Sequence, residues 1–383
     1  MKTLTRLVPA AVAAIAIAAL GAPAAFAATT SGASHDTGDG AGGAVFALTD
    51  NTAGNAVAAY HRAADGVLTP AGSYSTGGLG GVLPGSVIDH TASQGALAYA
   101  RDHGLLIAVN PGSNSISVFR VHGDRLTLDQ VLPSGGDFPV SVTVHGNHAY
   151  VLNALGGGSL YGYRVAGGQL APIAGSHRAL NLGTTAASGF VATPGQVTFT
   201  PDGSRLLVTT KGATNAVDVF AVRADGRLSA SPAVNSLPGD VPFGATFDHA
   251  GHVVIVEAGT SAIATFTLSR SGTLTQLDAR DTGQIAACWV VRAGRYFYTS
   301  NAGSGSLSGY TVGRSGELTA LGNTATDAGT VDAASAANGR FVYVQTGKAG
   351  IVDEFAVRAG GALSPIGSVT VQGGAGGEGI TAA

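Results

Sequence analysis

Two charged residues of opposite sign, Lys211 and Glu257, stand at equivalent positions of neighbouring repeats in a chain that is poor in charge. Hydrolysis of an ester needs a carboxylate that takes a proton from the attacking water and a cation that stabilises charge on the carbonyl oxygen. Glu257 and Lys211 are therefore the candidate general base and oxyanion partner. The alternative is a rim ion pair without a catalytic role, because ion pairs are common outside active sites.

Lys211 and Glu257 belong to a series of polar residues that recur where the second strand of each repeat is expected to end. The full series is Asn51, Asn110, Asn153, Lys211, Glu257, Asn301 and Gln345. If the repeats form a ring, these side chains gather around one mouth of its central channel. We therefore predict that the amides of Asn110, Asn153, Asn301 and Gln345 bind a ligand there. Asparagines that only cap turns are the alternative.

Four further candidate ligand-binding residues lie in short apolar runs that precede the second strands: Gln196, Phe243, Cys288 and Trp289. Cys288 and Trp289 are adjacent, and each is the single residue of its type in the chain. Because side chains alternate between the faces of a strand, we expect one of them to face the channel and the other to pack between sheets. A nucleophilic cysteine needs a depressed pKa and a basic partner, so a buried structural thiol is the alternative for Cys288.

A sequence unit that recurs seven times must position these residues. Each unit contains an apolar strand, a turn, a second strand ending in an aromatic residue, a polar turn and a leucine. The pairs of aromatic and leucine are Tyr60 and Leu68, Phe119 and Leu126, Tyr163 and Leu170, Phe220 and Leu228, Phe266 and Leu274, Tyr310 and Leu318, and Phe355 and Leu363. Alternation with period two, as in residues 105–109, indicates strands rather than helices. Small antiparallel sheets bury both faces when they stack around an axis, so we predict an all-β, seven-bladed β-propeller over residues 43–383.

The carboxyl-terminal segment is expected to close this ring. The other six units are preceded by an apolar run that fits an innermost strand, at residues 96–100, 140–144, 196–200, 243–247, 287–291 and 331–335. The first unit lacks such a run, whereas residues 378–383 follow the seventh complete unit. We predict that this segment supplies the missing innermost strand of blade one. Two unusually long connections, residues 71–95 and 172–195, would then lie at the same mouth as the polar series, where they form a binding site or a mobile decoration.

Composition excludes several classes of function. The formal net charge is −3 and only 11% of the residues are charged, so the chain lacks the basic surface that nucleic acids and anionic membranes require. A single cysteine excludes an internal disulfide. We expect neither a nucleic acid nor a membrane as partner. A small-molecule ligand, such as a lactone or a sugar-like compound, or a protein is the expected partner, and we expect a monomer.

Two motifs that suggest metal or nucleotide binding have weaker support than their spacing implies. The histidine pairs His145/His148 and His249/His252 fall in expected turns without a third ligand, so we predict no metal site. Residues 374–379 match G-x-G-x-x-G, but too few residues follow to form a helix. We therefore expect no cofactor.

The amino-terminal residues have the pattern of a secretory signal. Lys2 and Arg6 precede an apolar run at residues 7–20, and Ala-Phe-Ala at 25–27 fits a signal peptidase site. The alternative of a membrane anchor needs about 20 apolar residues, more than this run supplies. We predict a signal peptide at residues 1–27, a flexible leader at 28–42, and a protein secreted to the cell envelope or the extracellular space.

The repeated phrase N-x-G-S-x-S-I/L, as in residues 110–116 and 301–307, resembles the lactonase family of seven-bladed propellers, which includes 6-phosphogluconolactonases and carboxymuconate cyclases. The resemblance extends from about residue 43 to the end of the chain and implies the same fold and a lactone-hydrolysing activity. It also implies a Gly-Pro-Arg-His stretch at the start of an inner strand. In this chain residues 193–196 read Thr-Pro-Gly-Gln, so the arginine and histidine expected to hold a phosphorylated or carboxylated lactone are absent.

These observations lead to three expectations for function. The first is a secreted lactonase-like propeller that hydrolyses a small lactone or cyclic ester at the channel mouth. The second is a noncatalytic propeller that binds a ligand or protein in the cell envelope or extracellular space. The third is a structural module that uses the outer faces of its blades. None of them includes a membrane span, and fold alone does not choose among them.

Overall fold

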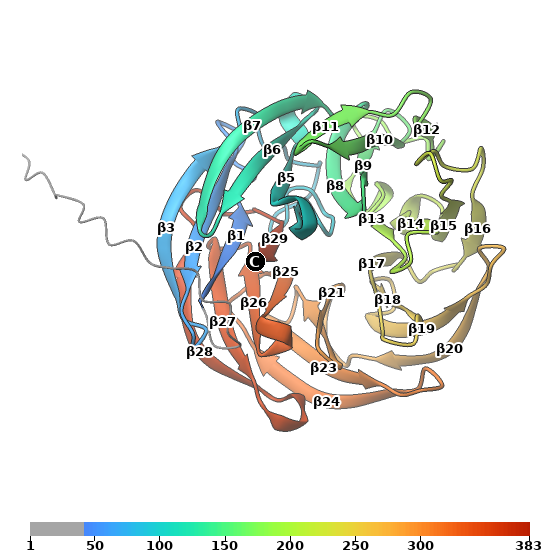
Figure 1. Ribbon diagram of the computed structural model, residues 1–383. Helices are drawn as coiled ribbons and strands as arrows, with labels where there is room; N and C mark the ends of the chain where they lie inside the picture. Colours follow the sequence, from blue (N-terminus) through green and yellow to red (C-terminus); the bar gives the residue numbers. More distant parts are fainter. Residues whose placement is uncertain (1–41) are drawn as a thin grey trace, which may run out of the picture. The chain divides into compact units, whose positions relative to one another are not determined.

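The computed structural model of the protein describes residues 42–383, which form a β-propeller (Figure 1). Its strands make seven antiparallel sheets, or blades, and helical structure within the described residues consists of short 3-10 turns. The predicted signal peptide and the leader up to residue 41 lie outside the described residues. The predicted fold class is confirmed.

Each blade is a run of strands ordered from the axis of the propeller outward. Blade one contains β29 (Ile380–Ala382), β1 (Gly43–Leu48), β2 (Ala56–Arg62) and β3 (Leu68–Ser75). Blade two contains β4 (Leu97–Ala100), β5 (Leu105–Asn110), β6 (Ser115–His122) and β7 (Arg125–Pro133). Blade three contains β8 (Asp137–His145), β9 (His148–Leu155), β10 (Ser159–Ala166) and β11 (Gln169–Pro172), and β12 (Arg178–Ala179) also pairs with β10. Blade four contains β13 (Gln196–Phe199), β14 (Arg205–Thr209), β15 (Ala216–Ala221) and β16 (Ala233–Ser236).

The remaining blades follow the same order. Blade five contains β17 (Pro242–Phe247), β18 (Val253–Glu257), β19 (Ala262–Leu268) and β20 (Leu274–Asp281). Blade six contains β21 (Ala287–Ala293), β22 (Tyr296–Asn301), β23 (Ser306–Val312) and β24 (Leu318–Ala325). Blade seven contains β25 (Thr330–Ala336), β26 (Phe341–Thr346), β27 (Ile351–Val357) and β28 (Leu363–Thr370). The 3-10 turns are η1 (Arg101–His103), η2 (Pro111–Ser113), η3 (Phe190–Ala192), η4 (Lys211–Ala213), η5 (Ala337–Gly339) and η6 (Ala359–Gly361).

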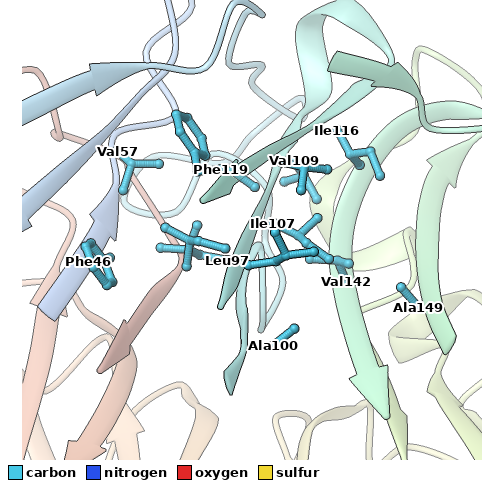
Figure 2. Close-up of a cluster of buried hydrophobic side chains, with 14 of the residues drawn as sticks. Phe46, Val57, Leu97, Ala100, Ile107, Val109, Ile116, Phe119, Val142 and Ala149 are labelled. Atoms are coloured by element: carbon cyan, nitrogen blue, oxygen red, sulfur yellow. The ribbon is translucent and has the colours of Figure 1, made fainter. Parts of the chain in front are cut away.

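The core lies between neighbouring blades, because each sheet covers the faces of the next. In Figure 2, Phe46 of blade one, Leu97 and Ile107 of blade two and Val142 of blade three form part of one buried cluster. All six residues of β5 are buried, which explains why its sequence is apolar on both faces. Each buried Val, Leu, Ile or Phe side chain contributes about 1.5–3 kcal/mol, so stacking of the blades supplies the stability that a single sheet lacks.

The carboxyl-terminal segment closes the ring, as the sequence predicts. Ile380, Thr381 and Ala382 of β29 pair antiparallel with Ala47, Phe46 and Val45 of β1. The Leu48 amide donates to the Gly379 carbonyl at 2.8 Å, and the Ala383 amide donates to Ala44 at 2.8 Å. Blade one is therefore built from both ends of the described chain.

Blades are also joined by tyrosine hydroxyls that donate to glycine carbonyls in the next blade. Tyr343 donates to Gly66 at 2.6 Å, Tyr150 to Gly226 at 2.8 Å and Tyr298 to Gly361 at 2.8 Å. Each of these glycines has a positive φ, and Gly66 has a φ of 96°. A Cβ at Gly66 would lie 2.3 Å from the Phe341 ring. This turn therefore needs glycine both for its backbone conformation and for its close contact with blade seven.

Replacing Gly66 with alanine is expected to lower the free energy of unfolding by about 2–4 kcal/mol, because left-handed backbone strain adds to overpacking against Phe341. The measurement is the midpoint of urea denaturation. Gly54→Ala is the matched control, since no atom lies within 4 Å of its added Cβ, and it should change stability by less than about 0.5 kcal/mol. Equal midpoints for both variants would show that this inter-blade contact is dispensable.

Candidate active site beneath the two long loops

The two long connections meet at one end of the propeller and enclose a pocket. These connections are residues 76–96, between β3 and β4, and residues 173–195, between β11 and β13. The Phe190 amide of the second loop donates to Pro84 of the first at 3.2 Å. Together with the innermost strands of blades five and six they surround a cavity of about 310 Å³, the loop pocket, whose lining includes Ile88, Asp89, Phe190, Phe243, Cys288 and Trp289.

Aromatic side chains form one wall of the loop pocket. The rings of Phe243 and Trp289 pack edge to face with centroids 4.9 Å apart. The indole Nε1 of Trp289 donates to the Ser93 carbonyl, which satisfies its polar atom and holds the ring against the first loop. The packing is apolar with a fixed orientation, which suits a small ligand that has a flat or aliphatic body.

Cys288 and Trp289 both line the loop pocket, so the expectation that one faces the channel and the other packs between sheets is wrong. The reason is a β-bulge, since the pairing of β21 with β22 shifts register between Ala287 and Trp289. A bulge interrupts the alternation of side chains along a strand. Burial raises the pKa of the Cys288 thiol to about 12, so the thiol is protonated at neutral pH and is not an activated nucleophile.

Lys211 is almost completely buried and joins the two long loops. Its Nζ donates to the carbonyls of Ala92 at 2.5 Å and Phe190 at 2.7 Å, and to Thr193 Oγ1 at 3.1 Å. The ammonium also lies 5.1 Å from the centroid of the Phe243 ring. Burial lowers the pKa of Lys211 to about 7, against the attraction of Asp89. With three acceptors in place, Lys211 organises the walls of the pocket.

Asp89 is the carboxylate in the wall of the loop pocket, and it is not among the residues predicted from the sequence. It is 3% exposed. Its Oδ1 accepts from the Thr91 amide and hydroxyl and from the Ala92 amide, and its Oδ2 accepts from the Ser93 amide. Burial raises the pKa of Asp89 to about 6, while Lys211 and these hydrogen bonds oppose the shift. The signal that could have found it is the turn sequence Asp-His-Thr-Ala-Ser at 89–93, inside the first long loop.

Glu257 lies at the end of β18 and outside the lining of the loop pocket. Burial, together with the negative charge of Asp240, raises the pKa of Glu257 to about 7. Its Oε1 is buried and has no hydrogen-bond partner within the described residues. No ion pair joins Glu257 to Lys211 in residues 42–383, so the structure does not bring the candidate acid and base into contact.

The predicted amides hold strands together and do not line the loop pocket. Asn110 donates to Ser115 and Ser117, and Asn301 donates to Ser306 and Ser308 in the same way. These bonds explain the repeated phrase N-x-G-S-x-S as a device that connects the second and third strands. The remaining amides, all buried, bond to strands or connections nearby: Asn153 to Ser134 and Ser159, Gln345 to Leu48, and Gln196 to Ala245.

Residues 89–95, the channel segment, lie across the mouth that the polar series was expected to line. The Ser93 hydroxyl donates to Val140 of β8 at 2.8 Å. The Gln94 side chain donates to the Val290 carbonyl at 2.9 Å and accepts from its amide at 3.0 Å, in β21. The Gln94 amide donates to Gly195 at 3.0 Å. The chain itself therefore occupies this mouth, and the loop pocket lies beside it against blades five and six.

The buried carboxyl group of Glu378 accepts hydrogen bonds from the channel segment, and Asp332 lies beside it. Glu378 accepts hydrogen bonds from the hydroxyls of Thr91 and Ser93, each at 3.1 Å, and from the Gly95 amide at 3.0 Å. Burial raises the pKa of Asp332 to about 6 and that of Glu378 well above its ordinary value, and the neighbouring Asp332 charge raises the Glu378 pKa further. At least one proton is therefore retained between these carboxyls at mildly acidic pH.

This carboxyl pair predicts an unusual pH dependence of stability. Unfolded carboxyls titrate near pH 4, whereas the folded pKa of Asp332 is raised to about 6 and that of Glu378 is raised well above its ordinary value. The contribution of Asp332 is therefore full below about pH 4 and lost as the pH rises through about 6, and that of Glu378 is lost as the pH rises further. We expect the free energy of unfolding to fall between about pH 4 and pH 7. Urea denaturation at a series of pH values measures it. Glu378→Gln should make the profile shallower, while Asp89 and Glu257, whose pKa values are also raised, keep part of the slope. A wild-type profile that rises across this interval would contradict the assignment.

Metal-ligating side chains do not gather in threes within residues 42–383. His252 instead pairs with Asp248 at 2.7 Å, and His249 accepts from Arg292. No helix in the part of the chain that the structure describes is long and apolar enough to cross a membrane.

The fold and the site together define a seven-bladed β-propeller with a loop-covered pocket. The chain resembles the lactonase family: the family model described as "Lactonase, 7-bladed beta-propeller" matches residues 192–376. This match confirms the resemblance indicated by the repeated phrase. No curated protein sequence matches the chain significantly.

Solved structures of the same fold cover almost the whole chain. A candidate 6-phosphogluconolactonase from Bacteroides fragilis is 18% identical with a TM-score of 0.71, over 91% of this chain and 100% of that one. A second candidate, from Bacteroides uniformis, is 17% identical with a TM-score of 0.73, over 90% and 100%. A periplasmic gluconolactonase from Pseudomonas aeruginosa is 20% identical with a TM-score of 0.70, over 89% and 99%. At these identities the likeness shows the fold.

Proposed function

We propose that this protein is a lactonase-like hydrolase that binds a small cyclic ester with an apolar body in the loop pocket. The observation that carries the proposal is the pocket itself, which is bordered by the first long loop and by Phe190 of the second, and walled by Phe243 and Trp289. Its volume of about 310 Å³ falls at the lower end of small-molecule sites. Resemblance to the lactonase family supplies the class of reaction, and the pocket supplies the kind of substrate.

The apolar surroundings of the pocket favour a substrate without phosphate or carboxylate groups. Among the described residues that line it, Asp89 alone is charged, and a second anion beside it would be repelled. Val87 is 80% exposed and Ile285 is 68% exposed on the adjoining loops. Exposed apolar residues around a pocket are typical of ligand-binding grooves. An alkyl or aryl lactone therefore fits better than a sugar phosphate lactone.

Hydrolysis requires a group that accepts a proton from water as its oxygen attacks the ester carbonyl. The ring carbon–oxygen bond then breaks, and the leaving alkoxide takes up a proton to give a hydroxy acid. Asp89 has the position for the base, since it lines the pocket and is ionised above about pH 6. Glu257 has a pKa of about 7 and an Oε1 that is unpartnered within the described residues. Because it does not line the loop pocket, it is the second candidate base only for a substrate that binds outside this pocket.

A noncatalytic binding role is the alternative, and a specific observation favours it. Both oxygens of Asp89 accept hydrogen bonds from its own loop, and Lys211 Nζ has three acceptors. Because the hydrogen bonds of Asp89 and Lys211 are already made within the protein, these groups can shape the wall of the pocket but are less available for proton transfer. This alternative predicts that ligands raise the melting temperature without being turned over.

The two functions separate in one set of measurements on the purified chain. Alkyl- and aryl-substituted γ- and δ-lactones and gluconolactone are tested for hydrolysis and for thermal stabilisation. Under the hydrolase proposal, Asp89→Asn lowers kcat by about 100-fold or more, in the range typical of a lost general base. Glu257→Gln tests the second candidate base, and Glu317→Gln, at an exposed position, is its matched control. If a lactone stabilises the protein but is not hydrolysed, the binding function is supported and the hydrolase proposal is excluded.

Trp289→Ala is expected to weaken the apparent affinity for an apolar lactone by about 10- to 100-fold, because a buried aromatic wall is a typical centre of binding energy. Calorimetric titration or KM measures the change. Trp289→Phe retains an aromatic ring and should restore most of the affinity. An unchanged affinity in Trp289→Ala would place the ligand elsewhere.

We also propose that the protein is exported to the cell envelope or the extracellular space. The basic residues, apolar run and Ala-Phe-Ala site within residues 1–27 support this. Mass spectrometry of the amino terminus after expression in a bacterial host tests it. A chain that begins at residue 28 and is recovered outside the cytoplasm is expected, and an intact amino terminus in the cytoplasm would contradict export.

A further inference from the structure

A second cavity lies at the end of the propeller opposite the loop pocket. Each innermost strand begins at the end with the long loops and finishes at the other, where a turn leads to the second strand. This cavity, of about 690 Å³, is lined by residues of such turns and by the ends of strands, among them Arg62, Arg101, His249, Arg292 and Asn338. We refer to it as the arginine mouth.

Arg62 is a buried arginine in the lining of the arginine mouth. Its side chain is only 4% exposed, and its Nε is buried without a hydrogen-bond partner within the described residues. One terminal nitrogen reaches the Ala63 carbonyl at 3.5 Å, and the guanidinium lies 5.8 Å from the centroid of the Phe341 ring. Because this nitrogen is buried, Arg62 contributes positive charge to the mouth rather than a hydrogen bond to a ligand in it.

The other two arginines are held in place by neutral acceptors. Arg292 donates from Nε to Gly294 at 2.9 Å, from Nη1 to Phe247 at 3.0 Å and from Nη2 to His249. Arg101 donates to the Ala382 carbonyl. Burial lowers the pKa of Arg292, and the negative charge of Asp248 opposes this shift. These contacts fix the directions of the guanidinium groups before any ligand arrives.

These arginines form no close ion pair within the described residues, although Asp248 attracts the charge of Arg292. No carboxylate of residues 42–383 forms an ion pair with Arg62, Arg101 or Arg292. Three arginines therefore line the mouth without a paired carboxylate side chain among the described residues. Like charges held together in a concave site raise the local concentration of anions.

We propose that the arginine mouth binds a small, multiply charged oxyanion, such as a phosphate compound or a polycarboxylate. Guanidinium groups present forked N–H donors that match the oxygens of phosphate and carboxylate. The exposed guanidinium of Arg101 supplies hydrogen bonds, and Arg62 and Arg292 add positive charge. The volume accommodates an anion larger than inorganic phosphate. This site is separate from the loop pocket and does not depend on the proposed hydrolysis.

Calorimetric titration with inorganic pyrophosphate and with citrate, at constant ionic strength against chloride, tests this proposal. We expect at least one of the two to bind. Arg101→Gln should weaken binding by about tenfold, the effect of one charge-assisted contact. Arg292→Gln removes a positive charge and should weaken binding by a smaller factor. Arg125→Gln, at an exposed position of β7, is the matched control and should leave the affinity unchanged. Trp289→Ala should also leave it unchanged, because that residue belongs to the loop pocket.

Preference for pyrophosphate or for citrate identifies which kind of oxyanion the site accepts, and either result supports the proposal. Equal affinity of the wild type, Arg101→Gln and Arg292→Gln would overturn it, as would heats of titration no larger than those of chloride. Circular dichroism of each variant establishes that the propeller is intact. Arg62 is left unchanged in this test because its side chain also packs on Phe341.

Discussion

Deletion of residues 376–383 is expected to abolish the cooperative unfolding transition of the propeller. The deletion removes β29, which pairs with β1, and Glu378, which holds the channel segment. It also leaves Asp332 buried without its carboxyl partner. We expect a loss of more than about 5 kcal/mol, comparable with the whole stability of many domains. Urea denaturation followed by circular dichroism measures the effect.

A synthetic peptide of residues 376–383 provides the sharpest control for this deletion. If ring closure is the cause, adding the peptide to the truncated chain should restore a cooperative transition in a concentration-dependent way. Deletion of Ala383 alone, which removes the hydrogen bond to Ala44, should have a small effect. A truncated chain that unfolds at the same urea concentration as the full chain would show that closure by β29 is unnecessary.

Replacement of Lys211 with methionine should destabilise the protein by about 3–5 kcal/mol, as when one partner of a buried charge pair is removed. Two carbonyl acceptors, Ala92 and Phe190, lose their ammonium donor, and Asp89 loses the charge that opposes the rise of its pKa. Because Lys211 joins both long loops, the variant should also lose affinity in the loop pocket. The midpoint of urea denaturation and calorimetric titration with a lactone measure the two effects.

Lys348→Met is the matched control for this prediction, because Lys348 is exposed. It should change the free energy of unfolding by less than about 0.5 kcal/mol. The pair of variants compares the same chemical change in a buried and an exposed position. A Lys211→Met protein with wild-type stability and wild-type lactone affinity would contradict the joining role of Lys211.

The architecture could be predicted from the sequence because each blade repeats the same local pattern of strand, turn and aromatic residues. The recurring aromatic is buried in every blade; Tyr60, Phe119 and Phe355, for example, are at most 3% exposed. The closing strand could be predicted for a simple reason: one blade lacked an innermost run, and one segment was left over. Period-two alternation and turn residues act over a few positions, so they are visible in a single sequence.

The candidate site could be predicted only in part. Phe243, Cys288 and Trp289 share the loop pocket because all three lie in innermost strands. Asp89 was missed because its loop has no counterpart in the other blades, and the path of a unique loop depends on distant contacts such as Gln94 with Val290. Lys211 and Glu257 occupy equivalent positions in the repeat, but they are not in contact, because each side chain is positioned by the residues that surround it.

The channel segment has a consequence for how the molecule responds to a ligand. These seven residues touch the loop pocket through Asp89, blades three and six through Ser93 and Gln94, and the closing end of the chain through Glu378. A compound bound against Asp89 would therefore restrain the junction where the first and last strands of the propeller, β1 and β29, pair. Hydrogen–deuterium exchange at the Leu48 amide, which bonds to Gly379, would slow as the pocket fills, so occupancy and resistance to opening would increase together.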